Sequence, residues 1–291
     1  MKPAAFEYHR PSTAAEAVEM LTSLGDGAKV LAGGQSLVPM LALRLAVFDD
    51  LIDIARIPEL DGIERRNGSL WIGAGTTEAA VERSAEVSTS VPLLARATPL
   101  IGHFQIRNRG TVGGSIAHAD PAAEYPAVVL ALDAELEALS PRGPRTIAAA
   151  DFFTGLWSTS LEADELLTGV RFPVWEGRCG FAVEEFARRH GDFAVAGAAV
   201  AVQLDADDRI SRCGIGLIGM GSTPERPAAT EAEVLGRPVA GVDAAEVGRS
   251  AVADLSAVPS DLHGSDDYRS RVGAAMVARA WTAATKEALG G

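Results

Sequence analysis

The first sixty residues alternate between helical and strand-like hydrophobic spacing. One apolar face repeats three and four positions apart and consists of Ala17, Met20, Leu21 and Leu24. We expect a helix there that Thr13 caps and Gly25 ends. Short apolar runs at Ala28–Ala32 and Leu51–Ile54 predict strands on either side of a short helix over Leu37–Leu45. This order of elements indicates a compact α/β unit.

The middle of the chain mixes both kinds of spacing. Strand-like patterns occur at Ser69–Ala74, Glu135–Leu139, Thr146–Ile147 and Glu165–Phe172, and helical patterns at Thr76–Ala85, Val91–Thr98 and Pro126–Leu132. The polar, turn-rich segment Asp61–Gly68 predicts a joint between two subdomains. Gly102–Asp120 shows neither periodicity, so we expect an irregular segment there.

The pattern changes after residues 173–180 (PVWEGRCG), which we interpret as a domain boundary. Three consecutive strands are expected beyond it, at Phe181–Arg188, Ala194–Leu204 and Ile210–Met220. Helical patterns then follow at Ala228–Leu235, Ala244–Ala253 and Tyr268–Leu289. This part of the chain is therefore predicted to be an antiparallel meander followed by helices.

The charge balance argues against some classes of partner. The 291 residues include 26 Lys and Arg against 39 Asp and Glu, a formal charge of −13, and only Lys2, Lys29 and Lys286 are lysines. Nucleic acids and anionic membranes require clustered basic side chains, which this chain lacks. Two cysteines, Cys179 and Cys213, supply neither a disulfide framework nor the ligands of an iron–sulfur cluster. No apolar run approaches the ~20 residues that span a bilayer, so we expect a soluble cytoplasmic protein.

One glycine motif imitates a dinucleotide fingerprint. Gly214, Gly216 and Gly219 form G-x-G-x-x-G, which in a Rossmann fold follows a strand and opens a helix. Here the motif lies within an apolar strand and leads into Gly221 and Pro224, with no helix start. We interpret these glycines as close-packing positions in the meander.

A first candidate site follows the second predicted strand, at Lys29, Val30, Leu31, Ala32, Gly33, Gly34, Gln35 and Ser36. Two glycines allow the main chain to turn and bring its N–H groups close to a ligand, and the Ser36 hydroxyl adds a donor. A turn that opens a helix is suited to a phosphate. Several such contacts can hold a pyrophosphate without lysines. A tight turn with a capped helix is the alternative.

A second candidate site lies at Thr111, Gly113, Gly114 and Ser115, where small side chains are expected to leave amides exposed to a ligand. His118 and Asp120 follow at alternate positions, which in an extended chain face the same way. No third ligand has metal-site spacing, so we favour hydrogen bonding by His118 over metal binding. Glu124 can accept hydrogen bonds from ribose hydroxyls, or be a solvated carboxylate at a helix start. Together the two segments suggest a dinucleotide in a cleft between subdomains.

The sequence AGGQS at 32–36, followed by IGHFQIRNRGTVGGSIAHADP at 101–121, resembles the FAD-binding medium subunit of the molybdenum hydroxylases, the carbon monoxide dehydrogenase and xanthine dehydrogenase family. The similarity also covers FEYHRPST at 6–13, ADELLTGVRFP at 163–173 and RRHGDFAVAG at 188–197. It implies an α+β fold. Residues 1–176 resemble a two-part FAD-binding domain of the vanillyl-alcohol-oxidase and MurB type, with subdomains of about 1–58 and 59–176. Residues 177–291 resemble the family's C-terminal domain, a three-stranded antiparallel sheet with a helical bundle.

The resemblance also implies roles for individual residues. Ala32–Ser36 and Thr111–Ser115 match the segments that wrap the FAD pyrophosphate, Ile101 matches a residue against the isoalloxazine ring, and Glu124 matches the ribose-binding acid. Leu167 matches an apolar contact near the adenine, and Phe193 matches an aromatic position near the flavin.

The chain departs from the family at two places. Glu184 and Glu185 stand where relatives often have a lysine, which puts the flavin contact of that lysine in doubt. Phe193 lacks the hydroxyl of the tyrosine found in relatives. We interpret Arg188 and Arg189 as a solvated basic pair, with direct flavin contact as the alternative.

The implied function is electron transfer. In such enzymes a large molybdopterin-binding subunit oxidises the substrate, a small subunit holds two [2Fe-2S] clusters, and the medium subunit receives electrons on FAD and passes them to an external acceptor. The resemblance implies a heterohexamer, a dimer of three-subunit units, in the cytoplasm or peripheral to the inner membrane face through the complex. No catalytic side chain and no metal ligand is expected in this chain, because the cofactor carries the redox chemistry. A stand-alone FAD-dependent oxidoreductase and a non-catalytic nucleotide-binding module are the alternatives.

Overall fold

The computed structural model describes residues 2–290. Its N-terminal unit is a three-stranded parallel sheet in the order β1-β3-β2, with β1 at Glu7–His9, β2 at Ala28–Leu31 and β3 at Asp50–Asp53. Helix α1 (Ala14–Leu24) connects β1 to β2, and α2 (Leu37–Leu43) connects β2 to β3. The side chain of Thr13 caps α1 by accepting the Glu16 N–H, and Gly25 follows the helix with φ 63°. The sequence prediction of an α/β unit is therefore confirmed.

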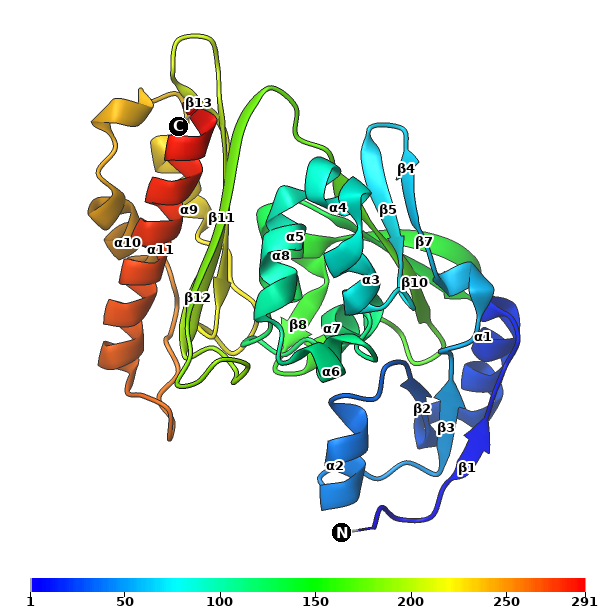
Figure 1. The fold of residues 1–291 in the computed structure, drawn as a ribbon. Coiled ribbons are helices and arrows are strands. Elements are labelled where there is room, and N and C mark those ends of the chain that lie inside the picture. Colours follow the sequence, from blue (N-terminus) through cyan, green and yellow to red (C-terminus); the bar gives the residue numbers. More distant parts are fainter. Residues whose placement is uncertain (1, 291) are drawn as a thin grey trace.

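A five-stranded antiparallel sheet forms the centre of the molecule, in the order β4-β5-β10-β6-β7 (Figure 1). Its strands are β4 (Ile63–Arg66), β5 (Ser69–Gly73), β6 (Glu135–Ser140), β7 (Gly143–Ala148) and β10 (Leu166–Pro173). The helices between β5 and β6 are α3 (Glu78–Arg83), α4 (Ala85–Ser90), α5 (Pro92–Ala97), α6 (Phe104–Arg107), α7 (Val112–His118) and α8 (Glu124–Ala131). A two-stranded hairpin, β8 (Phe153–Gly155) and β9 (Ser158–Thr159), precedes β10.

The C-terminal part is the predicted antiparallel meander, β11 (Arg178–Phe186), β12 (Ala196–Leu204) and β13 (Ile210–Ile218). Three helices follow: α9 (Ala228–Val234), α10 (Ala244–Ala253) and α11 (Asp266–Ala288). The meander lies between two helical layers, with α10 and α11 on its outer face and α5 and α8 on its inner face (Figure 1). Short 3-10 helices occur at Gly25–Gly27, Pro58–Leu60, Thr98–Leu100, Ala149–Asp151 and Val239–Gly241.

Strand β12 is buried on both faces, which explains its continuous apolar sequence. Ala199 and Ala201 belong to a hydrophobic cluster that also contains Val128 of α8. Val200 and Val202 belong to a second cluster with Trp281 of α11. The first cluster extends into the central sheet and its helices, so one hydrophobic core crosses the sequence position of the expected domain boundary.

The glycine motif in β13 is a packing device, as its strand context predicts. A Cβ atom at Gly214 would overlap the carbonyl oxygen of Ala131, and one at Gly216 would overlap that of Ala127. Both carbonyls belong to α8, so the missing side chains let this helix lie against the strand. The motif joins the central part of the molecule to the meander and opens no helix.

One organisational prediction was wrong. The segment Gly102–Asp120 is not irregular, because it contains α6 and α7. Thr111 is the N-cap of α7, and its hydroxyl accepts the Gly114 N–H at 3.0 Å, so the glycines lie in the first helical turn. The segment Asp61–Gly68, predicted to be a joint between subdomains, contains strand β4, which pairs with β5 as the first strand of the central sheet. The elements in both segments are too short to produce a recognisable period of apolar residues.

Within residues 2–290, no helix has the length and apolar character needed to cross a bilayer. The same described residues contain no group of three or more His, Cys, Asp or Glu side chains arranged to hold a metal ion.

Candidate functional site: a cavity between two glycine turns

The two glycine segments identified in the sequence lie against each other. Gly33 packs on the main chain of Arg109 and Gly110, because a Cβ at Gly33 would overlap the Arg109 carbonyl and lie 2.8 Å from the Gly110 Cα. Gly114 faces Ala32, since a Cβ at Gly114 would lie 3.4 Å from the Ala32 Cβ. Segments about 75 residues apart thus form one continuous wall of main chain and small side chains.

This wall borders a cavity of about 700 Å³, within the range of small-molecule and cofactor sites, about 300–1,000 Å³. All three parts of the chain contribute to its lining: the parallel unit, the central part and the loop before β12. The predicted site residues on its wall are Lys29, Val30, Ala32, Gly33, Gly34, Gln35, Ser36, Ile101, Thr111, Gly113, Gly114, Ser115, His118, Glu124, Leu167 and Phe193. Leu31 is the exception and does not line the cavity.

The first turn presents unpaired main-chain donors. Within the described part of the chain, the N–H groups of Gly33, Gly34, Gln35 and Ser36 have no protein acceptor. The turn is closed by the Val38 N–H, which donates to the Gly34 carbonyl at 3.0 Å. Gly34 has φ 75°, a left-handed conformation that favours glycine. Unpaired amides on a cavity wall are suited to an anionic group such as a phosphate.

The second segment differs from the sequence expectation of exposed amides. The N–H groups of Val112 and Gly113 donate to the Thr76 and Ala74 carbonyls, and the Gly114 and Ser115 amides donate to Thr111. These amides are therefore already used within the protein. The glycines instead allow this segment to pack closely on its neighbours, because a Cβ at Gly113 would overlap Ala74. The contribution of this segment is a smooth main-chain surface close to the first turn.

The lining contains acidic groups whose surroundings favour the neutral form. Glu124 is 7% exposed, so the alternative of a solvated helix-start carboxylate was wrong. Burial, reinforced by the nearby Glu185, raises the pKa of Glu124 to about 8. A neutral carboxyl both donates and accepts hydrogen bonds, so it can pair with a sugar hydroxyl in either direction. Burial lowers the pKa of His118, although Asp120 opposes this effect, so a neutral imidazole is favoured.

His118 and Asp120 are not presented by an extended chain as expected. His118 is the last residue of α7, and Ala119 after it has a left-handed φ of 54°. Both side chains nevertheless line the cavity. Asp120 accepts the Ala122 N–H at 2.9 Å, which shapes the loop into α8.

Glu78 and Trp157 are two of the cavity residues that sequence reasoning missed. Glu78 is 4% exposed at the start of α3, where an acidic residue is ordinary and gives no signal in the sequence. Trp157 lies in the tight β8–β9 turn with φ 53°, and its ring is nearly parallel to that of His118, at 10° with centroids 6.3 Å apart. A bulky residue at positive φ is unusual, but nothing in the sequence of this turn indicated that Trp157 lines a cavity.

Phe193 lines the cavity, whereas Glu184, Glu185, Arg188 and Arg189 do not. Neither Glu184 nor Glu185 lines the cavity, and burial raises the pKa of Glu185 to about 7. Arg188 and Arg189 are exposed, and Arg188 donates to the Leu262 carbonyl at 3.0 Å. Phe193 lines the cavity with 68% of its surface exposed, so its ring is available for a further contact.

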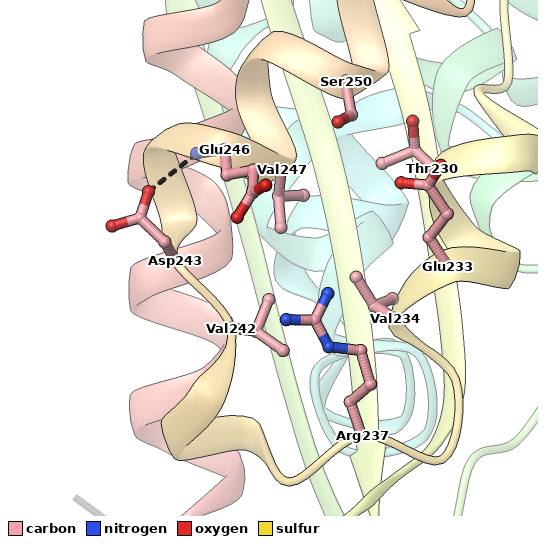
Figure 2. Close-up of a pocket in the computed structure, with 9 residues that line it drawn as sticks. All are labelled: Thr230, Glu233, Val234, Arg237, Val242, Asp243, Glu246, Val247 and Ser250. Carbon is pink, nitrogen blue, oxygen red and sulfur yellow. Dashed lines mark hydrogen bonds between the residues drawn. The ribbon is translucent and has the colours of Figure 1, made fainter.

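The C-terminal part has a crevice of a different kind (Figure 2). It holds about 30 Å³, enough for one or two water molecules, and is lined mostly by α9, α10 and the segment between them. Its charged groups already serve the fold: Asp243 accepts the Glu246 N–H as N-cap of α10, and Arg237 donates to the Gly241 carbonyl. The crevice is too small for an organic substrate.

Comparison with known proteins agrees with this geometry. Residues 4–175 match the family model described as the FAD binding domain in molybdopterin dehydrogenase. Residues 181–284 match the model described as the CO dehydrogenase flavoprotein C-terminal domain. The chain therefore belongs to this family, the FAD-binding medium subunits of carbon monoxide dehydrogenase-like molybdenum hydroxylases, and the resemblance noted in the sequence is confirmed.

Individual relatives are similar over nearly their whole length. The chain is 41% identical over 279 residues to the 6-hydroxypseudooxynicotine dehydrogenase complex subunit alpha of Paenarthrobacter nicotinovorans, covering 96% of this chain and 94% of the relative. It is 40% identical over 284 residues to the carbon monoxide dehydrogenase medium chain of Hydrogenophaga pseudoflava, covering 98% of each. The solved carbon monoxide dehydrogenase of the same organism superposes with a TM-score of 0.94 and 40% identity, covering 99% of both chains. FAD is thus the family's cofactor for this chain, and the family's molybdenum and iron–sulfur centres belong to other subunits.

Proposed function

We propose that this chain holds FAD in the 700 Å³ cavity and transfers electrons between a partner subunit and an external acceptor. One observation carries the proposal: two glycine segments distant in sequence touch and border a single large cavity, with unpaired amides on one of them. The cavity, the donors and the neutral acidic groups fit a ligand with a diphosphate, a sugar and a flat apolar ring system.

Each group of lining residues has a role in this proposal. The amides of Gly33–Ser36 donate to the diphosphate, and the segment Thr111–Ser115 provides the surface on which it lies. Glu124 hydrogen bonds with the ribose, and Leu167 contacts the adenine. Ile101 and Phe193 pack against the isoalloxazine ring. His118, neutral at physiological pH, is placed to hydrogen bond with the ligand. We also propose a division into an FAD-binding domain at 1–176, with subdomains of about 1–58 and 59–176, and a C-terminal domain at 177–291; the matched ranges 4–175 and 181–284 support it.

FAD supplies the redox chemistry, accepting and releasing two electrons, and the chain's residues bind, orient and shield it. We infer that electrons arrive from [2Fe-2S] clusters in a small partner subunit and originate in a large molybdopterin-binding subunit. Relatives are named as a medium chain and a complex subunit, which supports a multi-subunit assembly, and we propose a dimer of heterotrimers. A stand-alone oxidoreductase would need its own substrate pocket, and the 30 Å³ crevice of the C-terminal part does not provide one.

The test combines spectroscopy with assembly. Purified chain mixed with FAD is expected to retain the flavin absorption bands after desalting, in a one-to-one ratio. Co-expression with its large and small partners is expected to give a complex in which substrate reduces the bound flavin. A chain that binds ADP but not FAD would support the nucleotide-binding module instead. A chain that oxidises a substrate without partners would support the stand-alone enzyme.

A further inference from the structure

Glu78 is a buried acidic side chain with no partner in the protein. The residue is 4% exposed, and its Oε2 atom is buried without a hydrogen-bond partner within residues 2–290. Native structures leave few buried polar atoms unpaired, and each such atom calls for an explanation. Glu78 lines the cavity, so a ligand in the cavity is the partner available to it.

Arg107, the cation whose charge acts on Glu78, is already paired with another acid. Arg107 faces Glu78 from α6, but the guanidinium binds both carboxylate oxygens of Glu82, at 2.9 and 3.1 Å. Arg107 also donates to the carbonyls of Ile101 and Gly102. Its charge lowers the pKa of Glu78 only in part, and burial raises that pKa to about 8. Burial therefore favours the undissociated form of Glu78, which has an O–H group to donate.

The other charged and titratable groups around Glu78 reinforce its neutral state. Glu124 and Tyr125 face it from α8, and Glu82 lies on its own helix. Tyr125 is fully buried and is already hydrogen bonded with Thr98. None of these groups supplies a positive charge that would stabilise an ionised Glu78.

The main chain fixes the position of Glu78 at the second glycine segment. Its own N–H donates to the Gly110 carbonyl at 2.9 Å, and a Cβ at Gly110 would lie 2.5 Å from the Glu78 Oε2. Gly110 in turn packs against Gly33. Glu78 therefore lies against the second glycine segment, and Arg107, whose charge acts on Glu78, donates to the Ile101 carbonyl.

We propose that Glu78 is a ligand-binding residue whose carboxyl O–H donates a hydrogen bond to the flavin half of FAD, at an acceptor of the ribityl chain or the isoalloxazine ring. This inference rests on the proposed function. The carboxyl makes no hydrogen bond that the apoprotein needs. A ligand in the cavity accounts for a buried carboxyl group that lacks a hydrogen-bond partner within residues 2–290.

The test compares Glu78→Gln and Glu78→Met, which keep the size of the side chain, for FAD and for ADP, which lacks the flavin half. Glu78→Met is expected to weaken FAD binding about tenfold and leave ADP binding unchanged, because only the flavin half loses a donor. Glu78→Gln keeps an N–H donor and is expected to bind FAD within about threefold of the wild type. Apoprotein melting temperatures are expected to stay the same or rise in both variants.

The dependence of FAD affinity on pH is a second test of the proposal. Wild-type FAD affinity is expected to fall as pH rises from 7 to 9, because the ionised carboxylate cannot donate, whereas Glu78→Gln lacks this component. The measurement is repeated in a Glu124→Gln background, since Glu124 titrates in the same range. Unchanged FAD affinity in Glu78→Met, or equal losses for FAD and ADP, would overturn the proposal. If wild-type protein binds ADP but not FAD, the proposed function fails first.

Discussion

The main chain of Gly33 lies directly against the carbonyl group of Arg109, although 76 positions separate the two residues. No side chain larger than a hydrogen atom fits at Gly33 without moving one segment away from the other. The contact sets the spacing between the first turn, with its unpaired amides, and the segment that opens α7. It follows that the proposed diphosphate site depends on backbone approach and not on basic side chains.

Gly114→Val is expected to abolish FAD binding, with a loss of affinity greater than about 100-fold. The branched side chain would enter the space beside Ala32 and displace the Thr111 hydroxyl, which lies 2.7 Å from the position of its Cβ. Gly241→Val is the matched control, because no atom lies within 4 Å of a Cβ there. Fluorescence titration with FAD and thermal unfolding of both apoproteins check the prediction. Yellow, flavin-loaded Gly114→Val protein would refute it.

Gly216→Ala is expected to destabilise the protein by about 1–3 kcal/mol, because the added methyl group would overlap the Ala127 carbonyl and push α8 away from β13. Urea denaturation measures the change, with Gly241→Ala as a control in open space. If the three glycines were a dinucleotide fingerprint, the variant would lose nucleotide affinity at unchanged stability. That result would contradict the packing interpretation.

Buried acids make the stability of the apoprotein depend on pH. Burial raises the pKa of Glu78 and of Glu124 to about 8 and that of Glu185 to about 7, from an ordinary value of 4.5. At these groups the folded chain binds more protons than the unfolded chain between those values, so their contribution to the free energy of unfolding falls as pH rises from about 5 to 8 and then levels off. His118, whose pKa burial lowers from 6.5, opposes part of this fall below pH 6.5. Glu185→Gln is expected to flatten part of this fall and to stabilise the protein at pH 8 by about 1–2 kcal/mol, allowing for partial solvent screening.

Urea denaturation at pH 5, 6, 7 and 8 tests this dependence. Carboxylates whose pKa is lowered by arginine, such as Glu165 and Asp261, act below pH 4.5 and leave this window unaffected. A stability that rises with pH from 5 to 8, or a Glu185→Gln variant with the full wild-type slope, would show that these acids are ionised in the folded protein.

The isolated chain is expected to hydroxylate no organic substrate. Its large cavity is assigned to FAD, and the crevice of about 30 Å³ in the C-terminal part has no room for a second molecule. Dye reduction is measured with aldehydes, purines and N-heterocycles, and the assembled complex from the same preparation is the positive control. Substrate-dependent reduction by the pure chain would show that it contains a substrate site of its own.

Local sequence signals predicted the regular parts of the fold well. Thr13 and Gly25 bound α1 as expected, and the three strands of the meander lie within two or three residues of their predicted limits. The pattern failed where elements are short. Helix α7 begins with Val112-Gly113-Gly114, and glycines disfavour a helix. The reason for glycine at these positions is close contact with Ala74 and Ala32, which the sequence does not show. Those contacts are tertiary and leave no mark in the local spacing.

The candidate site was predictable to a similar degree. Gly33 and Gly114 marked the two turns because close backbone approach requires glycine, and both line the cavity. Glu78 was not predicted as a site residue, because an acidic residue in a first helical turn is ordinary. Its burial and its unpaired oxygen distinguish it, and both are visible only in the structure. The amides of the second segment could not be judged in advance, since their acceptors at Ala74 and Thr76 come from another part of the chain.

The hydrophobic cluster that includes Val128 of α8 and Ala199 of β12 continues across the position where the two family models meet. Severing the peptide between them would leave apolar surface of each half facing water. We therefore expect neither fragment to fold on its own, and the whole molecule to melt in one cooperative step. A chimera that takes one of these two parts from a relative would accordingly fold only if the cluster residues of both parts come from the same relative.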